Sequence, residues 1–521
     1  MTSTSTWATH CDACGAPLPT MAPTAGAAPA ASASTAASGG PSTWNGSTPG
    51  PAGPAPRWGG GHDITRYLCA AAYLDRAYAE TLIGQVAAEP HLGVAPAPAC
   101  DVPVVLRHAY LANARRHQRD LLLTALLALT LAGLLGILPP WTTPLALLGA
   151  WSTALTFEFS TRYGSHLQSL RPNRFHPAAA PEPPNPGSTA RLRQIDAYAR
   201  GNITAYSGYS PYTGYGTRLE SWSLMFDITA PAAAGSAPQD VDVVELYTHV
   251  AQRLRTLALP ALEIEERLFV AGDHLIGDPR FLADPLGRPL TTIGQDAMDA
   301  LKRHPEENAR PYLAAHSTAW DGELVTSLFL RFVRSRSNLS VEGFQTVLLP
   351  LAERYRVIDG LLPSPSPGDV VEVLTQSLVS TPFLILLAPV RAVRGFSPDR
   401  WISWRTRRQN KRITALNRFD YGARVGVREA AAVPRHQRHF QKADATMALK
   451  AMEKRALDAL VEFAEARGID VSELVQRQEV IVNNGIIATQ GASVSSNSVA
   501  SGPKSRISLR PLNRIPLVNT N

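Results

Sequence analysis

The 521-residue chain has few cysteines and little charge. Its four cysteines, Cys11, Cys14, Cys69 and Cys100, are too few for a disulfide framework in a chain of this length. Cys69 lies in the apolar run LCAAAYL, where a small buried hydrophobic side chain is expected. Charged residues make up 18% of the chain, below the roughly 25% of soluble globular proteins. We therefore expect a reducing compartment and an apolar environment around part of the chain.

The sequence also lacks the commonest catalytic signatures. It contains no HExxH, no GxSxG, no GxxxxGK[ST] and no GxGxxG after a strand. The commonest metalloprotease, α/β-hydrolase, P-loop and dinucleotide-binding classes are thereby excluded. Many active sites carry no motif, so an enzyme stays an alternative to a non-catalytic protein.

Residues 1–62 have no hydrophobic period and are dominated by Ala, Pro, Ser, Thr and Gly. Such a segment cannot bury enough apolar surface to offset its ordering entropy, so a disordered arm is expected. The first ten residues have no Lys or Arg and no apolar core, so no cleaved signal peptide is expected.

The same arm contains half of a zinc ribbon, Cys11-Asp-Ala-Cys14. A structural zinc ion takes four ligands, and the chain has no second CxxC. Cys69, Cys100 and His62 are the remaining candidates. A degenerate remnant, or a site shared between chains, is favoured over a complete site, and zinc is the one cofactor suggested.

A two-helix transmembrane hairpin is predicted at 121–159, after a helical juxtamembrane region at 63–120. Leu121 to Leu138 is eighteen residues without charge, which is long enough for a span. After PPWTTP, a second apolar stretch runs from Trp141 to Phe159. Arginines flank both spans and the connecting turn has no charge, so the positive-inside rule places both flanks in the cytoplasm. The alternative is a buried hairpin in a soluble core.

A Pro-rich linker at 176–190 leads into an α+β domain at 196–360. Strands are expected at 201–207, at 221–228 and around 264–270. Asp321-Gly322 between two apolar runs predicts a two-residue hairpin turn, and another strand follows SRSN. Asp240 is the expected N-cap of a helix between the strands at 221–228 and around 264–270. The predicted fold is an antiparallel sheet with helices on one side.

Four tyrosines recur at every third residue in YSGYSPYTGYG: Tyr206, Tyr209, Tyr212 and Tyr215. Period three matches polyproline II geometry, and the intervening Gly and Pro oppose a helix. Four phenols on one edge could bind a ligand or lie at a lipid interface. The simpler interpretation is a loop whose tyrosines pack over the adjoining sheet.

Three acids, Glu263, Glu265 and Glu266, cluster at the start of the strand EIEERLFV. Such a cluster can act as a metal or acid–base site, but it has no spacing signature. A solvated strand end is the favoured interpretation.

The segment 370–412 joins an apolar run, 370–390, to a basic block with two tryptophans. The block contains Arg391, Arg394, Arg400, Trp401, Trp404, Arg405, Arg407, Arg408, Lys411 and Arg412. A span at 370–390 would place this block outside the cell, against the positive-inside rule. We therefore expect an interfacial or re-entrant helix with its cations on anionic head groups. A solvated or protein-bound basic face is the alternative, and nucleic acid is disfavoured.

Residues 413–480 are expected to be helical. A stripe on 442–467, formed by Leu449, Met452, Ala456, Leu460 and Phe463, makes oligomerisation plausible. The last segment, 481–521, is rich in Asn, Gly and Val and is expected to be β-prone or flexible.

The chain resembles a family of integral membrane proteins from high-GC actinobacteria. The likeness rests on RYLCAAAYLD (66–75), the hairpin at 121–159, YSGYSP (206–211), WDGELVTSLFLRF (320–332), RFDYGAR (418–424) and VNNGIIATQG (482–491). The resemblance implies membrane placement. It implies no activity, cofactor or catalytic residue.

The net charge of +7 and the pI near 9.3 indicate an anionic partner. We expect a scaffold or interaction protein anchored in the bacterial cytoplasmic membrane, with both terminal regions in the cytosol. One alternative is a membrane-acting effector of a bacterial conflict system. Another is an enzyme acting on a lipid-linked or nucleotide substrate.

Overall fold

The structure is a computed structural model that describes residues 62–233, 235–360, 365–395 and 398–487. The chain divides into two units, Met1–Ala55 and Pro56–Asn521, and all described residues belong to the second. The arm expected at 1–62, apart from His62, lies outside the described residues. So does the tail beyond Ile487.

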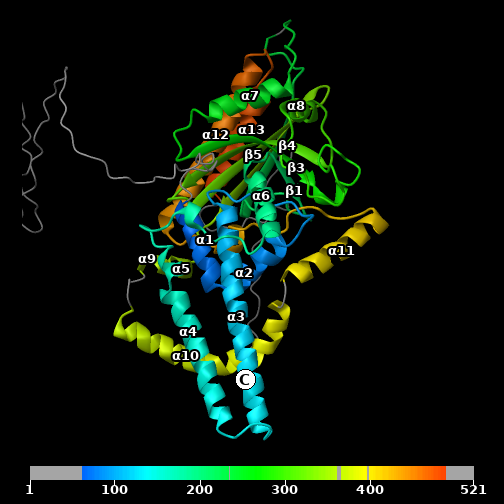
Figure 1. Cartoon of the computed structure of the whole chain (residues 1–521). Helices are drawn as coiled ribbons and strands as arrows, with labels where there is room; N and C mark the ends of the chain where they lie inside the picture. The colour runs from blue at the N-terminus through cyan, green and yellow to red at the C-terminus, as the bar shows by residue number, and fades with distance from the viewer. Residues whose placement is uncertain (1–61, 234, 361–364, 396–397, 488–521) are drawn as a thin grey trace, which may run out of the picture. The chain divides into compact units, whose positions relative to one another are not determined.

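A six-stranded sheet forms the centre of the α+β domain (Figure 1). Its strands are β1 (Ile203–Tyr206), β2 (Thr217–Asp227), β3 (Leu262–Ala271), β4 (Ala309–Ala319), β5 (Leu324–Arg334) and β6 (Asn338–Leu348). Their order is β1-β3-β4-β5-β6-β2. The α+β class is confirmed, but the sheet is mixed, because β1 pairs with β3 in parallel while every other pair is antiparallel.

The β4–β5 hairpin lies where Asp321-Gly322 predicts it, with a longer turn. Ala319 pairs with Leu324, so four residues connect the strands. Trp320, Asp321 and Gly322 all have positive φ, at 55°, 53° and 90°. The predicted position of the turn is correct, and the two-residue length is wrong.

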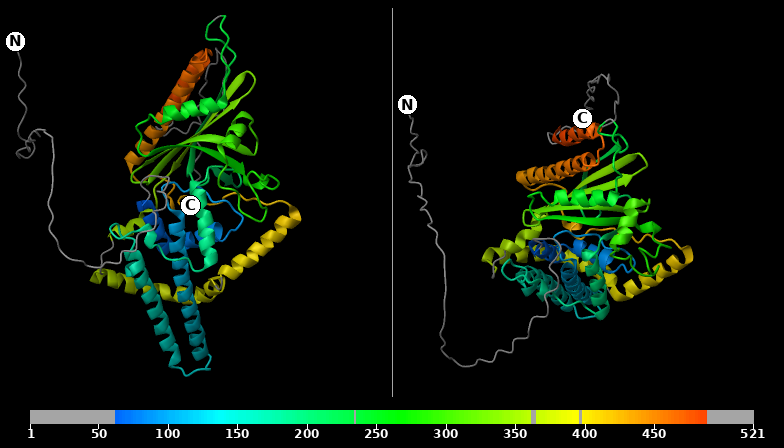
Figure 2. Two further views of the ribbon diagram at one scale, coloured as in Figure 1. Left: turned by 45° about the horizontal axis from the view of Figure 1, so that its top comes forward. Right: turned by 90° about the horizontal axis from the view of Figure 1, so that it is seen from above.

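Helices cover one face of the sheet, as both views of Figure 2 show. They are α7 (Val243–Leu254), α12 (His439–Glu465) and α13 (Ser472–Ile487), with α8 (Gln295–Arg303) nearer to β4. The N-cap of α7 is Asp242, whose carboxylate accepts from the Val244 N–H, while Asp240 pairs with Arg334. The expected cap at Asp240 is therefore wrong by two residues.

The apolar stripe of α12 is buried inside this helical layer. Leu449, Met452, Ala456, Leu460 and Phe463 are each at most 4% exposed, in one core with α7 and the sheet. The stripe is therefore packed within the chain, and oligomerisation stays a prediction. The helix α13 reaches Ile487, so a β-prone segment beginning at 481 is wrong for 481–487.

A helical layer from the first third of the described chain forms a second core beside the other face of the sheet. It contains α1 (His62–Leu74), α2 (Arg76–Thr81), the π-helix η1 (Leu82–Ala87), the first part of α3 (Val102–Leu134) and α6 (Pro186–Arg200). Short elements complete the connections: α5 (Ser165–Gln168), η2 (Pro177–Ala179), η3 (Gly272–His274), η4 (Glu353–Arg356), α9 (Val357–Gly360) and η5 (Glu429–Ala431).

The rest of α3 pairs with α4 (Thr142–Tyr163) as a helical hairpin, which α10 (Pro367–Gly395) crosses (Figure 1). Within the described residues, one helix is long and apolar enough to cross a membrane, the Pro367–Val393 part of α10, with a mean hydropathy of 1.8. The hairpin of α3 and α4 is therefore not confirmed as a membrane span, and that assignment stays a prediction. The basic block is divided between two helices: Arg391 and Arg394 lie on α10, and its residues from Arg400 to Arg412 lie on α11 (Pro398–Leu416).

Candidate functional site

The four tyrosines do not share an edge. Tyr209 is 92% exposed, Tyr206 ends β1 half-buried, and Tyr212 and Tyr215 are 3% and 1% exposed. Both buried rings lie in an aromatic cluster on the sheet, where Tyr212 is 4.8 Å from the Phe329 ring between centroids. Burial raises the pKa of Tyr212 far above its usual range, so this phenol stays neutral. The packing interpretation describes Tyr212 and Tyr215, and only Tyr209 is fully presented to solvent.

Glycines and one acid hold this loop on the sheet. Gly214 and Gly216 have φ of +96° and +87°, and a Cβ on Gly216 would lie 2.4 Å from the Val347 carbonyl oxygen. The Gly214 N–H donates to the Glu429 carboxylate at 2.7 Å. Positive φ breaks a period-three helix, which explains why the predicted common edge does not form.

The RFDYGAR segment meets the start of the same loop. Ser207 donates to the Asp420 carboxylate, and the Ala423 N–H donates to the Ala205 carbonyl at 2.8 Å. A Cβ on Gly422 would lie 2.1 Å from the Tyr206 carbonyl carbon, so only glycine fits there. The segments YSGYSP and RFDYGAR therefore form one unit, although more than 200 residues separate them along the chain.

A buried charged network lies on the sheet face behind Tyr215. The Arg267 guanidinium, 2% exposed, binds both Glu265 carboxylate oxygens, at 2.7 and 3.1 Å. It also donates to Thr204 Oγ1 and to the Gly201 carbonyl, each at 3.1 Å. His316 Nε2 lies 3.5 Å from Glu265 Oε1, and its Nδ1 lies 2.7 Å from Ser327 Oγ. The ring of Tyr215 stacks on His316 at 5.2 Å with an interplanar angle of 3°.

This network corrects the interpretation of EIEERLFV as a solvated strand end. Burial alone would raise the pKa of Glu265, but the Arg267 and His316 side chains hold it well below its usual range. Glu265 therefore stays ionised, and Glu265 and Arg267 form a closed pair whose bonds are made inside the chain. Strand alternation was the available signal, because Glu265 and Arg267 are two residues apart and share one face of β3.

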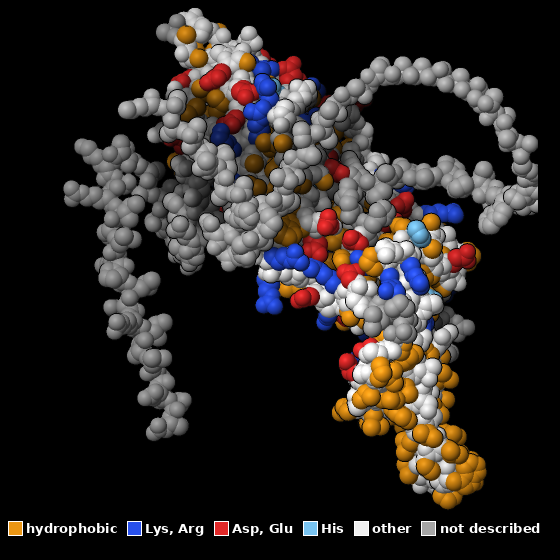
Figure 3. Space-filling model, turned by 90° about the vertical axis from the view of Figure 1, so that its left-hand side faces the viewer, with side chains coloured by type: hydrophobic (Ala, Val, Ile, Leu, Met, Phe, Trp, Pro, Cys, Tyr) orange, Lys and Arg blue, Asp and Glu red, His pale blue; other side chains and the backbone are white. Residues whose placement is uncertain are grey.

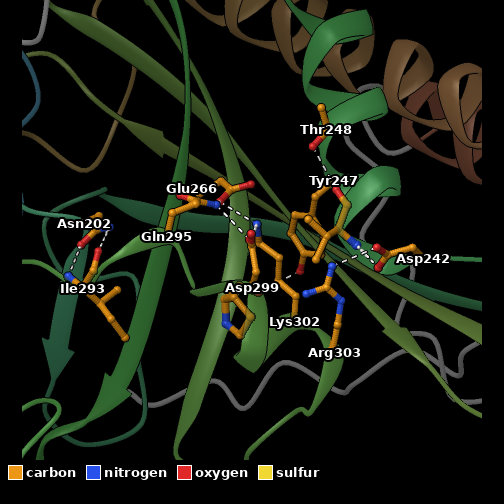
Figure 4. A network of polar contacts seen from close by, with 12 residues as sticks. Asn202, Asp242, Tyr247, Thr248, Glu266, Ile293, Gln295, Asp299, Lys302 and Arg303 are labelled. Atoms are coloured by element: carbon orange, nitrogen blue, oxygen red, sulfur yellow. Dashed lines mark hydrogen bonds and ion pairs between the residues drawn. The ribbon is translucent and has the colours of Figure 1, made fainter. Parts of the chain in front are cut away.

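The neighbouring Glu266 points to the helix-covered face and joins a second network (Figure 4). Lys302 on α8, whose side chain is 1% exposed, binds Glu266 at 2.7 Å and Asp299 at 2.8 Å. Its ammonium also lies 5.0 Å from the centre of the Tyr247 ring. Gln295 donates to Glu266 and Asp299, each at 2.9 Å.

A cavity of about 370 Å³ opens beside this second network. Glu266, Gln295, Thr248 and Arg255 contribute its polar lining, and Ile264 contributes apolar lining. The size suits a small polar molecule. Among the described residues, no group of three or more His, Cys, Asp or Glu side chains is arranged to hold a metal ion.

The α3–α4 hairpin and α10 expose an apolar surface. Figure 3 shows hydrophobic side chains gathered over the far end of the α3–α4 hairpin. The large hydrophobic side chains exposed on this apolar surface include Leu121, Leu122, Leu129, Leu131, Leu134, Leu135, Ile137, Trp141, Leu145, Leu147 and Leu148 on the hairpin, with Val371, Leu378, Val379, Phe383, Leu386, Leu387, Val390 and Val393 on α10. Leu123 and Ala150 pack against Ile385 and Ala388, which joins the three helices. An apolar surface of this extent marks an interaction site in a folded protein.

The basic helix α11 has two different faces. Ile402 and Ile413 are buried, and Arg405 and Gln409 from the same side bind the buried carboxylate of Glu89. The opposite face exposes Trp404, Arg407, Arg408, Lys411 and Arg412. The guanidinium of Arg408 lies 5.6 Å from the centre of the Trp404 ring.

The structure therefore separates the residues expected at a membrane surface. Arg405 binds Glu89 within the chain. The exposed face of α11 carries Trp404, Arg407, Arg408, Lys411 and Arg412. Arg391 lies on α10, and the side chains of Arg394, Arg400 and Trp401 are outside the described part of the structure. Cys11 and Cys14 are also outside it, so the zinc hypothesis stays a prediction. Cys69 is fully buried, as expected, and burial raises the pKa of its thiol.

Comparison with known proteins gives a family for just over half of the chain. A family model described as an AbeC-like domain matches residues 221–496. The match begins within β2 and includes α10, α11 and α12, while the tyrosine loop and the α3–α4 hairpin precede it. No curated protein and no solved structure matches the chain. The chain belongs to the AbeC-like domain family.

Proposed function

We propose that the protein is a membrane-anchored interaction or scaffold protein of the bacterial cytoplasmic membrane, with its α+β domain in the cytosol. The observation that carries this proposal is the exposed apolar surface of α3, α4 and α10. Soluble monomers rarely expose apolar patches of more than a few hundred Å². A bilayer would bury this surface without any further protein contact.

The exposed face of α11 supports the same placement. Four cations, Arg407, Arg408, Lys411 and Arg412, point away from the body, and Trp404 lies among them. Each cation near an anionic membrane contributes about 1 kcal/mol, so this face could add about 4 kcal/mol. Trp side chains favour the head-group region. The actinobacterial integral membrane family suggested by the sequence is in keeping with this proposal.

The edge strand β2 supports an interaction role for the cytosolic domain. Among the described strands, β2 pairs with β6 alone, and its first five residues are exposed. An edge strand with an open hydrogen-bonding side can add a strand from another polypeptide. Met225, 53% exposed on β2, is a suitable position for a photo-cross-linking side chain. An adduct with a second polypeptide, including a second copy of this chain, is the expected result.

Carbonate extraction of cells that express the full chain tests the membrane assignment. The protein is expected to stay in the membrane pellet, because lipid binding through the apolar surface of α3, α4 and α10 does not depend on charge. Replacing the four exposed α11 cations by Gln should leave this resistance intact and should reduce binding to anionic vesicles at low salt. Complete release of the wild-type chain by carbonate would refute integral anchoring.

A further inference from the structure

Charged side chains on the α3–α4 hairpin end at Asp120 on α3 and at Glu158 on α4. Asp120, 1% exposed, forms ion pairs with Arg76 and Arg119, each at 3.0 Å. On α4, Arg162 binds Glu158 at 3.1 Å. No residue between Asp120 and Glu158 is charged. The two ion-paired positions therefore mark the base of the apolar part of the hairpin.

The two helices of the apolar part are shorter than the hydrocarbon core of a bilayer is thick. Leu121–Leu134 of α3 is 14 residues and 142–157 of α4 is 16. At 1.5 Å per residue these lengths are about 21 and about 24 Å. The hydrocarbon core is about 30 Å thick, and half of a bilayer including head groups is about 20–22 Å. With Asp120 at the head-group surface, the ends of the two helices at the turn lie near the middle of the bilayer.

Most of the N–H groups of the tip are bonded within the hairpin itself. Leu135, Gly136, Ile137 and Leu138 donate their N–H groups to carbonyls at the end of α3, and Thr142 and Thr143 donate theirs to Pro139 and Pro140. The two prolines have no N–H to satisfy. Thr142 Oγ1 also donates to the Pro139 carbonyl, at 2.7 Å. Such a turn avoids much of the cost that excludes ordinary loops from hydrocarbon.

Both ends of α10 lie at the base of the hairpin. Near its start, Glu372 pairs with Arg162 at 3.3 Å. Toward its end, Ile385 and Ala388 lie in one buried cluster with Leu123, three residues beyond Asp120. A helix that crosses a membrane beside the hairpin would have only one end at this level, so α10 lies across the hairpin (Figure 1).

We propose that the chain enters the bilayer from the cytosolic side only. The α3–α4 hairpin penetrates one leaflet, and α10 lies in the plane of the membrane at the boundary between head groups and acyl chains. This inference rests on the proposed membrane anchoring and specifies its partner, the cytosolic leaflet. It differs from the two-span topology predicted from the sequence, in which the turn reaches the outside.

Cysteine labelling in intact cells separates the two topologies. Ile137, 73% exposed at the tip, is replaced by Cys, and Leu286, 42% exposed on the α+β domain, is replaced by Cys as the matched control. A membrane-impermeant maleimide is added to intact cells, to inside-out vesicles and to detergent-solubilised membranes. The parent chain gives the background from the native cysteines.

One-leaflet insertion predicts that Ile137→Cys is labelled only after detergent, while Leu286→Cys is labelled in inside-out vesicles. Labelling of Ile137→Cys in intact cells would show that the tip crosses the membrane and would overturn the inference alone. Labelling of Ile137→Cys in a soluble fraction without detergent would overturn membrane anchoring as well. The two failures are therefore distinguishable.

Depth-dependent quenching provides a second readout on purified protein. An environment-sensitive dye at Val379→Cys on α10 or at Ile137→Cys is measured in vesicles of phosphatidylethanolamine and phosphatidylglycerol with spin-labelled lipid. The expected result is stronger quenching of the α10 dye by a label near the head group, and of the tip dye by a label near the end of the acyl chain. Equal depth for both dyes, or no quenching of the α10 dye, would contradict the in-plane placement.

Discussion

Removing one partner of the buried Glu265–Arg267 pair is expected to destabilise the α+β domain strongly. Glu265→Leu leaves a guanidinium that is 2% exposed without its two carboxylate bonds. Arg267→Met removes the guanidinium from a buried carboxylate that lies 3.5 Å from His316 Nε2. Breaking such a pair costs about 3–5 kcal/mol, because an uncompensated charge stays in a low-dielectric interior.

The double variant Glu265→Leu/Arg267→Met is expected to lose far less than the sum of the single losses. Replacing both charges with apolar side chains of similar volume removes the desolvation cost together with the attraction. The free energy of unfolding is measured by urea titration of the full chain in detergent, followed by intrinsic fluorescence. The two single variants and the double variant form a double-mutant cycle.

The exposed pair Asp196–Arg200 on α6 is the matched control. Its atoms are 2.7 Å apart, and its side chains are 44% and 56% exposed. Asp196→Leu should change the free energy of unfolding by at most about 1 kcal/mol, because solvent screens the pair. The reasoning is refuted if Glu265→Leu costs no more than Asp196→Leu, or if the cycle shows no coupling.

Three further predictions concern the same domain. The folded chain holds the pKa of Glu265 below its ordinary value of 4.5, so the pair should stabilise the fold above that pH and lose its contribution as the pH falls. In acid-unfolding curves, the stability of the wild type should therefore fall more steeply with pH than that of the double variant. Tyr212→Ala should lower the free energy of unfolding in urea titration by about 3–5 kcal/mol, because the Tyr212 ring fills the aromatic cluster. Tyr209→Ala removes an exposed side chain and should change that free energy by less than about 0.5 kcal/mol. Equal losses would contradict the burial of Tyr212 and the exposure of Tyr209. Gly216→Ala should lower the thermal unfolding midpoint well below that of Gly235→Ala, since both have positive φ but only the first would bring a Cβ to 2.4 Å from a β6 carbonyl; similar midpoints would refute the close approach.

Local sequence signals predicted the elements that depend on neighbouring residues. The β4–β5 hairpin follows from two apolar runs around Asp321-Gly322, and α12 follows from its stripe at helical spacing. The parallel pairing of β1 with β3 was not predicted, because more than fifty residues separate them and no local pattern sets their direction. The Asn, Gly and Val content of 481–521 indicated a β-prone or flexible segment, but α13 continues to Ile487.

The buried site was missed for a different reason. Three acids in EIEERLFV resemble a solvated strand end, and their cost of burial argues against the interior. The compensating cation was nevertheless in the same motif, since Arg267 lies two residues after Glu265 on one face of β3. His316 and Tyr215 come from distant segments, so only the folded sheet brings them together. The period of three in the tyrosine loop misled because Gly214 and Gly216 reverse the backbone between the rings.

Flotation of the purified full chain with lipid vesicles tests the central claim, that the apolar surface of α3, α4 and α10 binds a bilayer directly. Wild type and Leu286→Asp are expected to float with vesicles of phosphatidylethanolamine and phosphatidylglycerol. The hairpin variant Leu131→Asp/Leu134→Asp should float to a much smaller extent, because each Asp in hydrocarbon costs about 2.5–3.5 kcal/mol. Both replaced leucines are at least 50% exposed, so the fold itself should persist. Flotation of the hairpin variant to the same extent as the wild type, or failure of the wild type to float, would contradict the account.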